Sequence, residues 1–250
     1  MLIRPKPRLA LRWLVAGASA LGLSGLPPGA ARAATAYSVL QVNICNSGYD
    51  RGCYTGRATE GAAEPIAGRT PSVVTMNEMC ESDLEPIRTR TGYAGTFTQS
   101  GTQTCTNGAP YGNAILFPAG TSVGTPERLT YRAQSSRTEL RTLTCVPAAG
   151  LTACVTHLAP TSVKAAQATE MRDAVGARAG QGATVLGGDW NMADGGHPNA
   201  QDYVPAGMFS KSDGAVQHVL ATSAHFTFVG TQVMRQDWTD HPALQVNLTR

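Results

Sequence analysis

The sequence predicts an α/β protein in which two packed β-sheets are flanked by helices. Strand-like apolar runs are many and short along residues 34–250, whereas helical patterns are few, and this balance favours two packed sheets. The chain of 250 residues is 42% hydrophobic and 15% charged, which indicates a globular protein and excludes disorder across the whole chain. The length fits one large domain or two small ones, and no linker divides it.

Residues 1–33 are expected to lie outside the fold. A basic segment precedes an apolar run at 13–26, which is too short to span a bilayer comfortably. Pro27 and Pro28 end this run, and a small-x-small cleavage site finishes at Ala33. The pattern is that of a secretory signal peptide, with a membrane anchor as the alternative. We therefore expect a secreted protein, cleaved near Ala33, with no stable membrane anchor.

Removal of that segment changes the charge. Five of the 20 basic residues and none of the 17 acidic residues lie in residues 1–33, so residues 34–250 carry 15 basic and 17 acidic residues, a net charge of −2. A strongly basic surface for nucleic acid is not supported, although a local basic patch is compatible with this charge.

An even number of cysteines in an exported chain predicts disulfides. Local geometry favours a bridge that closes the polar loop between the first two, a bridge across a hairpin for the last two, and a bridge between the remaining two. The expected pairs are Cys45–Cys53, Cys145–Cys154 and Cys80–Cys105. A zinc site is the competing interpretation, but no C-x-x-C pair is present.

The strands are predicted from period-two alternation and from short apolar runs that end at turn residues. Segment 37–44 alternates, 73–76 is a short buried run, 111–117 ends at a proline, and 140–146 with 151–156 forms a hairpin. A further core strand starts at Val185 and stops at two glycines. The remaining extended segments are 93–98, 225–229 and 245–249, and 195–214 is expected to be a long loop.

Three helices are predicted. Segment 60–69 has weak signals, whereas Ser82 to Glu85 forms a capping box for a helix that ends before Gly92. The third helix begins after a cap at Thr161 or Ser162 and ends near Ala179. Its small apolar face suits close packing on a sheet.

Polar side chains follow most of the predicted core strands. Each one alone is more often a solvated or structural residue than a functional one. Because several occur at strand ends, we expect them to gather in one site: Asn43, Glu78, His157, Asp189, Asn191, and Asp240 with His241 in the turn before the last strand. Residues i and i+2 of a strand face the same way, so Asp189 and Asn191 face one pocket while Trp190 turns away.

These motifs, in this order, resemble the endonuclease/exonuclease/phosphatase superfamily, the fold of DNase I-like nucleases, abasic-site endonucleases and neutral sphingomyelinases. The resemblance spans residues 34–250 and rests on Gln-Val-Asn at 41–43, Met-Asn-Glu at 76–78, Tyr-Gly-Asn-Ala-Ile-Leu at 111–116, Val-Thr-His-Leu at 155–158, Gly-Gly-Asp-Trp-Asn at 187–191 and Thr-Asp-His at 239–241. It implies a four-layered α/β sandwich, one catalytic domain over 34–250, and phosphodiester hydrolysis that depends on Mg²⁺ or another divalent ion such as Mn²⁺ or Ca²⁺.

The resemblance also implies roles for single residues. Glu78 would bind the metal with help from Asn43, His241 would pair with Asp240, and Asp189 would orient the attacking water. Asn191 and His157 would hold phosphate oxygens, and Asn113 would contact the substrate. Apart from the resemblance, Arg141 on the strand that leads into the hairpin is a candidate phosphate contact, and a solvated arginine on the face of the strand is an equally good interpretation. A Mg²⁺ ion needs few protein ligands, because it keeps several coordinated water molecules. His157, if protonated, would stabilise phosphoryl charge.

One departure concerns the strand before the Asp-His motif, where the family often has an aspartate. His225 takes that place in the predicted alignment, so a second acidic contact is not expected from this strand. The leading hypothesis is a secreted, monomeric DNase I-like nuclease with a nucleic-acid substrate. The alternatives are a sphingomyelinase-like or small-molecule phosphodiesterase, with 205–209 as a candidate apolar hairpin, and a non-catalytic binding protein that kept the fold.

Overall fold

The computed structural model describes residues 34–49, 53 and 56–250, and residues Ala34–Arg250 form one compact unit. The signal peptide predicted for residues 1–33 lies outside the described residues. Within the described part, no helix combines the length and the apolar character that a membrane crossing needs.

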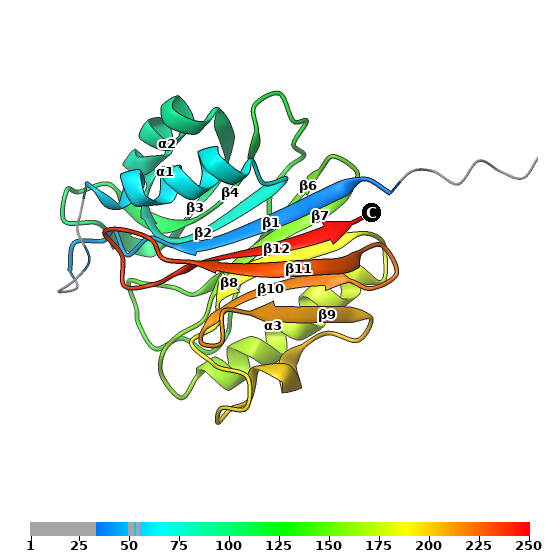
Figure 1. The fold of residues 1–250 in the computed structure, drawn as a ribbon. Helices are drawn as coiled ribbons and strands as arrows, with labels where there is room; N and C mark the ends of the chain where they lie inside the picture. The colour runs from blue at the N-terminus through cyan, green and yellow to red at the C-terminus, as the bar shows by residue number, and fades with distance from the viewer. Residues whose placement is uncertain (1–33, 50–52, 54–55) are drawn as a thin grey trace, which may run out of the picture. The chain divides into compact units, whose positions relative to one another are not determined.

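Two six-stranded sheets pack against each other (Figure 1). The first has the order β11 (Thr227–Met234), β12 (Ala243–Thr249), β1 (Ala36–Asn43), β2 (Val73–Cys80), β4 (Pro110–Pro118) and β3 (Tyr93–Thr104). The second has the order β5 (Glu127–Thr130), β6 (Thr142–Ala148), β7 (Leu151–His157), β8 (Thr184–Asp189), β10 (Gln217–Thr222) and β9 (Met208–Ser212).

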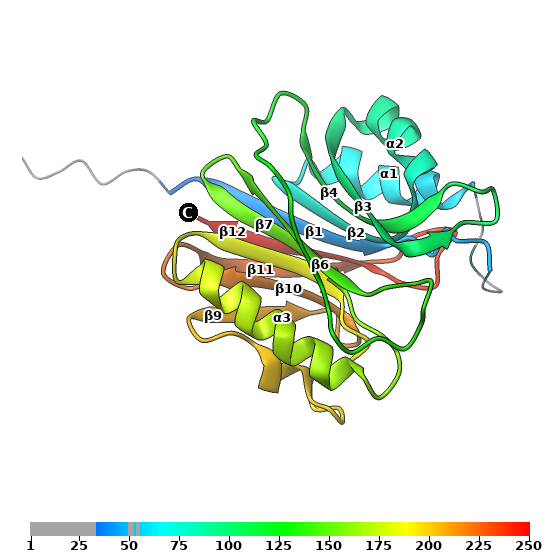
Figure 2. The same cartoon turned by 180° about the vertical axis from the view of Figure 1, so that it is seen from behind.

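Helices cover the outer face of each sheet (Figure 2). The helices on the first sheet are α1 (Ala58–Arg69) and α2 (Leu84–Thr91), which follows the short η1 (Glu81–Asp83), and the second sheet carries α3 (Lys164–Ala179) and η2 (Ala200–Tyr203). Successive side chains of one strand pack on opposite faces of its sheet. Val185 of β8 packs between the sheets, whereas Leu186 packs under α3. The predicted four-layered sandwich is therefore confirmed.

Several predicted boundaries are wrong. Strands β5, β9 and β10 were not predicted, and β9 lies inside the expected loop at 195–214. The Ser82 cap is absent, since the carboxylate of Asp83 accepts the backbone N–H of Cys80 instead (Oδ2 to N, 2.7 Å). Helix α3 begins after Val163 without a side-chain cap, which corrects the caps predicted at Thr161 and Ser162. The sequence therefore predicted both helices but not the residues at which they begin.

The predicted disulfides are all formed: Cys45–Cys53, Cys80–Cys105 and Cys145–Cys154. The last one joins directly opposed residues of β6 and β7. The described chain contains no free cysteine, so the zinc interpretation is wrong for these residues.

Strand direction brings one end of both sheets to a common edge. Strands β1 and β2 are parallel and place Asn43 opposite Asn77, while β7 and β8 are parallel and place His157 opposite Asp189. Strand β12 is antiparallel to β1, so the turn that holds His241 lies at the same end. The polar residues predicted at strand ends are gathered there.

Candidate active site

Asp189 lies at the centre of this end of the molecule. Its side chain is buried, and its Oδ2 accepts hydrogen bonds from the amides of Gln217 (2.8 Å) and Asn43 (3.1 Å). Its Oδ1 accepts the backbone N–H of Asn191 at 2.9 Å. Burial raises the pKa of Asp189, and the nearby His241 and these hydrogen bonds oppose that rise. The chain therefore holds this carboxylate in one orientation and supplies donors to its charged form.

Glu78 is brought beside Asp189 by an irregularity in β2. The register with β4 shifts between Met76 and Met79, and Glu78 takes a left-handed backbone conformation with φ of 57°. A left-handed glutamate is uncommon and costs free energy, which points to a constraint at this position. Burial raises the pKa of Glu78 from its ordinary value of 4.5 to about 7, and the carboxylate of Asp189 adds to the rise.

Asn43 joins the two acids. Its Nδ2 donates to Glu78 Oε1 (2.9 Å) and to Asp189 Oδ2 (3.1 Å), and its Oδ1 accepts the backbone N–H of Cys45 (3.0 Å). The amide nitrogen therefore faces the carboxylates. In this arrangement Asn43 orients Glu78 and does not turn its oxygen toward the space that a metal would occupy.

The two predicted histidines lie beside different acids. His157 is buried, with Nε2 3.6 Å from Glu78 Oε1, whereas His241 is partly exposed, with Nε2 3.7 Å from Asp189 Oδ2 and 3.5 Å from Asp240 Oδ1. Burial, followed by the positive charge of Arg141, lowers the pKa of His157 well below its ordinary value. His157 is therefore suited to act as a neutral donor rather than as a cation.

Asn191 and Arg141 supply further donors. The amide of Asn191 lies 3.4 Å from His157 Nε2 and donates to the carbonyl of Leu158 at 2.8 Å. Arg141 is buried and pairs with Glu139 at 2.8 Å, while its Nη1 is buried without a hydrogen-bond partner. An unpaired buried guanidinium nitrogen is costly, so an anion beside it would be stabilised.

Asn113 is placed differently from the other predicted residues. It is buried within the first sheet, where its Oδ1 accepts the amide of Asn77 at 2.8 Å. Asn77 in turn donates to the carbonyl of Thr156 and accepts the backbone N–H of Asp189 (3.0 and 2.8 Å). Asn113 thus supports Asn77, which links the two sheets. Among the described residues, its side chain has no hydrogen bond to His241 or to the two acids.

Sequence reasoning missed Gln217 and misplaced His225. Gln217 lies opposite Asp189 in the β8–β10 pairing and is fully buried. His225 precedes β11, whose first residues pair with the C-terminal end of β12, so it lies at the other end of the sheet. The residue beside Asp189 is therefore the neutral Gln217, and only the pairing of β10 with β8 shows it.

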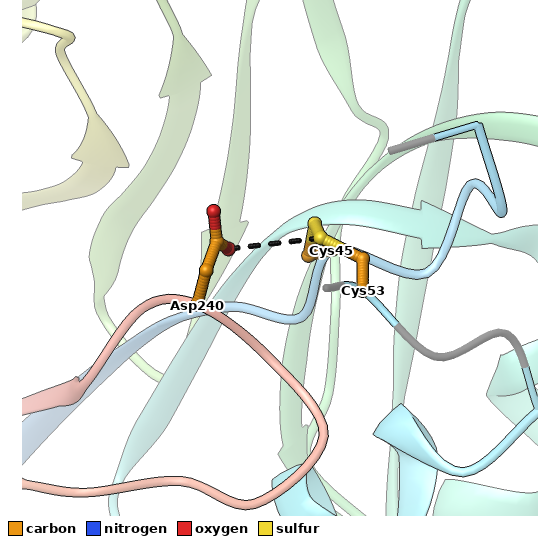
Figure 3. A group of neighbouring side chains, drawn as sticks. All are labelled: Cys45, Cys53 and Asp240. Carbon is orange, nitrogen blue, oxygen red and sulfur yellow. Dashed lines mark hydrogen bonds between the residues drawn. A yellow bond between two sulfur atoms is a disulfide. The ribbon is translucent and has the colours of Figure 1, made fainter. Parts of the chain in front are cut away.

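Asp240 approaches a disulfide beside the site (Figure 3). Its Oδ1 lies 3.8 Å from Cys53 Sγ, and Cys45, Cys53 and Asp240 are the one group of three potential metal-ligating side chains found among the described residues. Both sulfurs belong to the disulfide, and a thiolate is needed to bind a metal. This cluster is not a metal site.

Glu78 is the residue of the site that suits a hard divalent cation. Glu78 Oε1 accepts from Asn43, whereas no hydrogen bond from a described residue reaches Oε2. A buried carboxylate with a raised pKa and a second acid beside it is stabilised by positive charge. One carboxylate with retained waters suits Mg²⁺, so the residues present fit such an ion.

Solved structures with this fold are found although the sequences are dissimilar. No family model and no curated protein matches the chain. An endonuclease/exonuclease/phosphatase from Bacteroides vulgatus has a TM-score of 0.67 at 12% identity, covering 86% of this chain and 98% of its own. The mannosyl-6-phosphatase from Bacteroides thetaiotaomicron has a TM-score of 0.65 at 10% identity, covering 85% of this chain and 99% of its own. D. rerio TDP2 complexed with single-strand DNA product has a TM-score of 0.63 at 14% identity, covering 86% of this chain and 99% of its own. The chain therefore has the endonuclease/exonuclease/phosphatase fold.

Proposed function

We propose that this protein is a secreted phosphodiester hydrolase that depends on a divalent metal, and that it acts as a DNase I-like nuclease. The observation that carries the proposal is the linked group of Glu78, Asn43, Asp189 and His241 at one end of both sheets. Such a group of acids and imidazole beside an unpaired guanidinium suits attack of water on a phosphate. Structural neighbours that act on phosphate esters and bind DNA product support it.

The side chains divide the reaction between them. Asp189, fixed by Gln217 and Asn43, would accept a hydrogen bond from the attacking water and aim it at phosphorus. His241, between Asp189 and Asp240, would present its ring N–H to the phosphate. A divalent cation held by Glu78 would, when bound, polarise a phosphoryl oxygen and stabilise charge on it.

The remaining donors would hold the non-bridging oxygens. His157 as a neutral imidazole, the amide of Asn191 and the unpaired Nη1 of Arg141 surround the acids. Fixed donors of this kind stabilise the charge that develops in the transition state. Three disulfides support the proposal of export.

A small phosphoester is the second candidate substrate. The net charge of −2 over residues 34–250 provides no general attraction to a polyanion, and one structural neighbour is a sugar phosphatase. The sphingomyelinase alternative receives less support. In the proposed membrane hairpin Pro205 and Met208 are buried, and Phe209 packs against the core between the sheets.

An activity panel tests the proposal. The purified protein is incubated with plasmid DNA, RNA, sphingomyelin vesicles, bis-p-nitrophenyl phosphate and p-nitrophenyl phosphate, each with Mg²⁺, Mn²⁺, Ca²⁺ or EDTA. We expect cleavage of DNA and of the diester. EDTA should abolish this cleavage, and Glu78→Gln and His241→Ala should lower it strongly in folded protein. Absence of diester cleavage with every ion would refute the proposal, and hydrolysis of the monoester alone would favour the second candidate.

A further inference from the structure

A cavity of about 390 Å³ adjoins His241. It is lined by the turn between β11 and β12, at 235–242, and therefore shares His241 and Asp240 with the candidate active site. The roles proposed above use only these two residues of the turn. The other residues of this turn have no role in that proposal.

Trp238 presents an aromatic ring at this cavity. It is 37% exposed, whereas the other described tryptophan, Trp190, is fully buried. Its backbone has a φ of 69°, in the left-handed region that bulky residues rarely adopt. Such strain persists only where the surrounding structure imposes it, and it is concentrated at functional sites.

The first turn of α1 imposes the conformation of this turn. A Cβ atom at Gly61 would collide with the carbonyl oxygen of Asp237, so the absence of a side chain lets the turn lie against the helix. Arg57, directly before α1, lies over the Trp238 ring with its guanidinium carbon 3.6 Å from the ring centroid. The ring is therefore held by a cation–π contact and by backbone packing.

We propose that Trp238, held in place by Arg57 and with Arg235 beside it, forms a binding subsite for the nucleobase next to the scissile phosphate. A base has a flat π-face, and stacking on an aromatic ring or on a guanidinium plane is the usual way to bind it without sequence preference. The cavity joins Trp238 to His241, so a base bound there belongs to the nucleotide whose phosphate faces His241. This inference rests on the proposed function and names nucleic acid as its substrate.

The chemistry of the cavity favours a base over a lipid surface or a bare anion. Trp238 is the one large apolar side chain in the wall, and Asp237 and Asp240 are exposed beside it. Membrane binding needs a larger apolar area, and these two carboxylates oppose an anion placed directly beside Trp238, whereas the phosphate of a bound nucleotide would lie toward His241. A neutral planar ring with polar edges meets neither obstacle.

Binding in EDTA tests the subsite without catalysis. The probes are oligothymidylate of four nucleotides and an abasic deoxyribose-phosphate chain of the same length, followed by tryptophan fluorescence and by anisotropy of a labelled end. Trp238→Ala is expected to weaken binding of oligothymidylate about tenfold and to leave the abasic chain unchanged, while Trp238→Phe keeps most of the affinity. Quenching of fluorescence by the oligonucleotide should be lost in Trp238→Phe.

Phe228→Ala is the matched control. Phe228 is 38% exposed and also carries a cation over its ring, Lys211, but it lies at the opposite end of β11. The Phe228→Ala variant should bind both probes as the wild type does. Circular dichroism verifies that each variant is folded. Equal weakening for both probes, unchanged affinity in Trp238→Ala, or no binding by the wild type would overturn the subsite.

The two proposals fail separately. Hydrolysis of phosphodiesters without any dependence of binding on Trp238 would refute the subsite and leave the proposed function standing. Base-dependent binding through Trp238 without hydrolysis would refute the proposed function and support the subsite.

Discussion

Replacement of Glu78 by glutamine should stabilise the metal-free protein above pH 7. Burial raises the pKa of Glu78 from 4.5 to about 7, so the folded state holds a proton that the unfolded state has already released between these values. Stability is therefore full below pH 4.5 and falls as pH rises to about 7, because the unfolded state then binds fewer protons. Glutamine keeps an oxygen that accepts from Asn43 and removes the charge.

The size of the effect follows from the pKa change. About 2.5 pKa units at 1.36 kcal/mol each correspond to about 3 kcal/mol at pH 8. Urea unfolding in EDTA, followed by circular dichroism at pH 4 and pH 8, measures it. The difference in free energy of unfolding between Glu78→Gln and wild type should be near that value at pH 8 and should nearly vanish at pH 4.5 and below.

Two comparisons make this prediction decisive. Glu81→Gln, at an exposed glutamate of η1, should change stability little at either pH. Addition of Mg²⁺ at pH 8 should stabilise the wild type and not Glu78→Gln, because the ion would neutralise the buried carboxylate. A pH-independent difference, or a destabilised Glu78→Gln at pH 8, would refute the assigned burial and charge of Glu78.

Three other changes test neighbouring parts of the site. His241→Ala should lower phosphodiester hydrolysis by about 10²-fold or more with unchanged unfolding, as measured by initial rates and urea titration. Gln217→Leu should cost about 1–3 kcal/mol of stability, since it leaves acceptors of Asp189 and the Gln41 amide without their buried partner, and a neutral result in urea unfolding would contradict the network. The double change Cys45→Ser with Cys53→Ser should cost about 2–3 kcal/mol through loop entropy, whereas equal stability of the variant and the disulfide-bonded protein would show that the bridge adds none.

The layers of the fold could be predicted because their signals are local. The alternation of residues in β1 and the short apolar runs of β2, β4 and β8 indicate strands whose side chains are buried in the sandwich. The glycine stop after α2 was also predicted, and Gly92 has the left-handed conformation that a helix end requires. The disulfides followed from the same local reasoning.

Strand β10 could not be predicted from its residues. All six of its residues are buried, yet Gln217, His218 and Thr222 are polar, so neither alternation nor an apolar run marks it. These side chains are stable there because distant groups satisfy them: Gln217 bonds to Asp189 and Gln41, His218 to the carbonyl of Met192, and Thr222 to Thr184. Burial of a polar group is favourable only with such partners, which sequence alone does not reveal.

The sequence by itself determined the sandwich, its disulfides and the set of acids, amides and imidazoles that end its core strands. Tertiary structure decided how they are connected: a shifted register turns Glu78 toward Asp189, Asn43 presents its nitrogen rather than its oxygen, and Gln217 stands beside Asp189. The physical reason is range. Side-chain periodicity is fixed within a few residues of the chain, whereas the charge and hydrogen bonding of a buried group depend on residues that are distant in sequence and close in space.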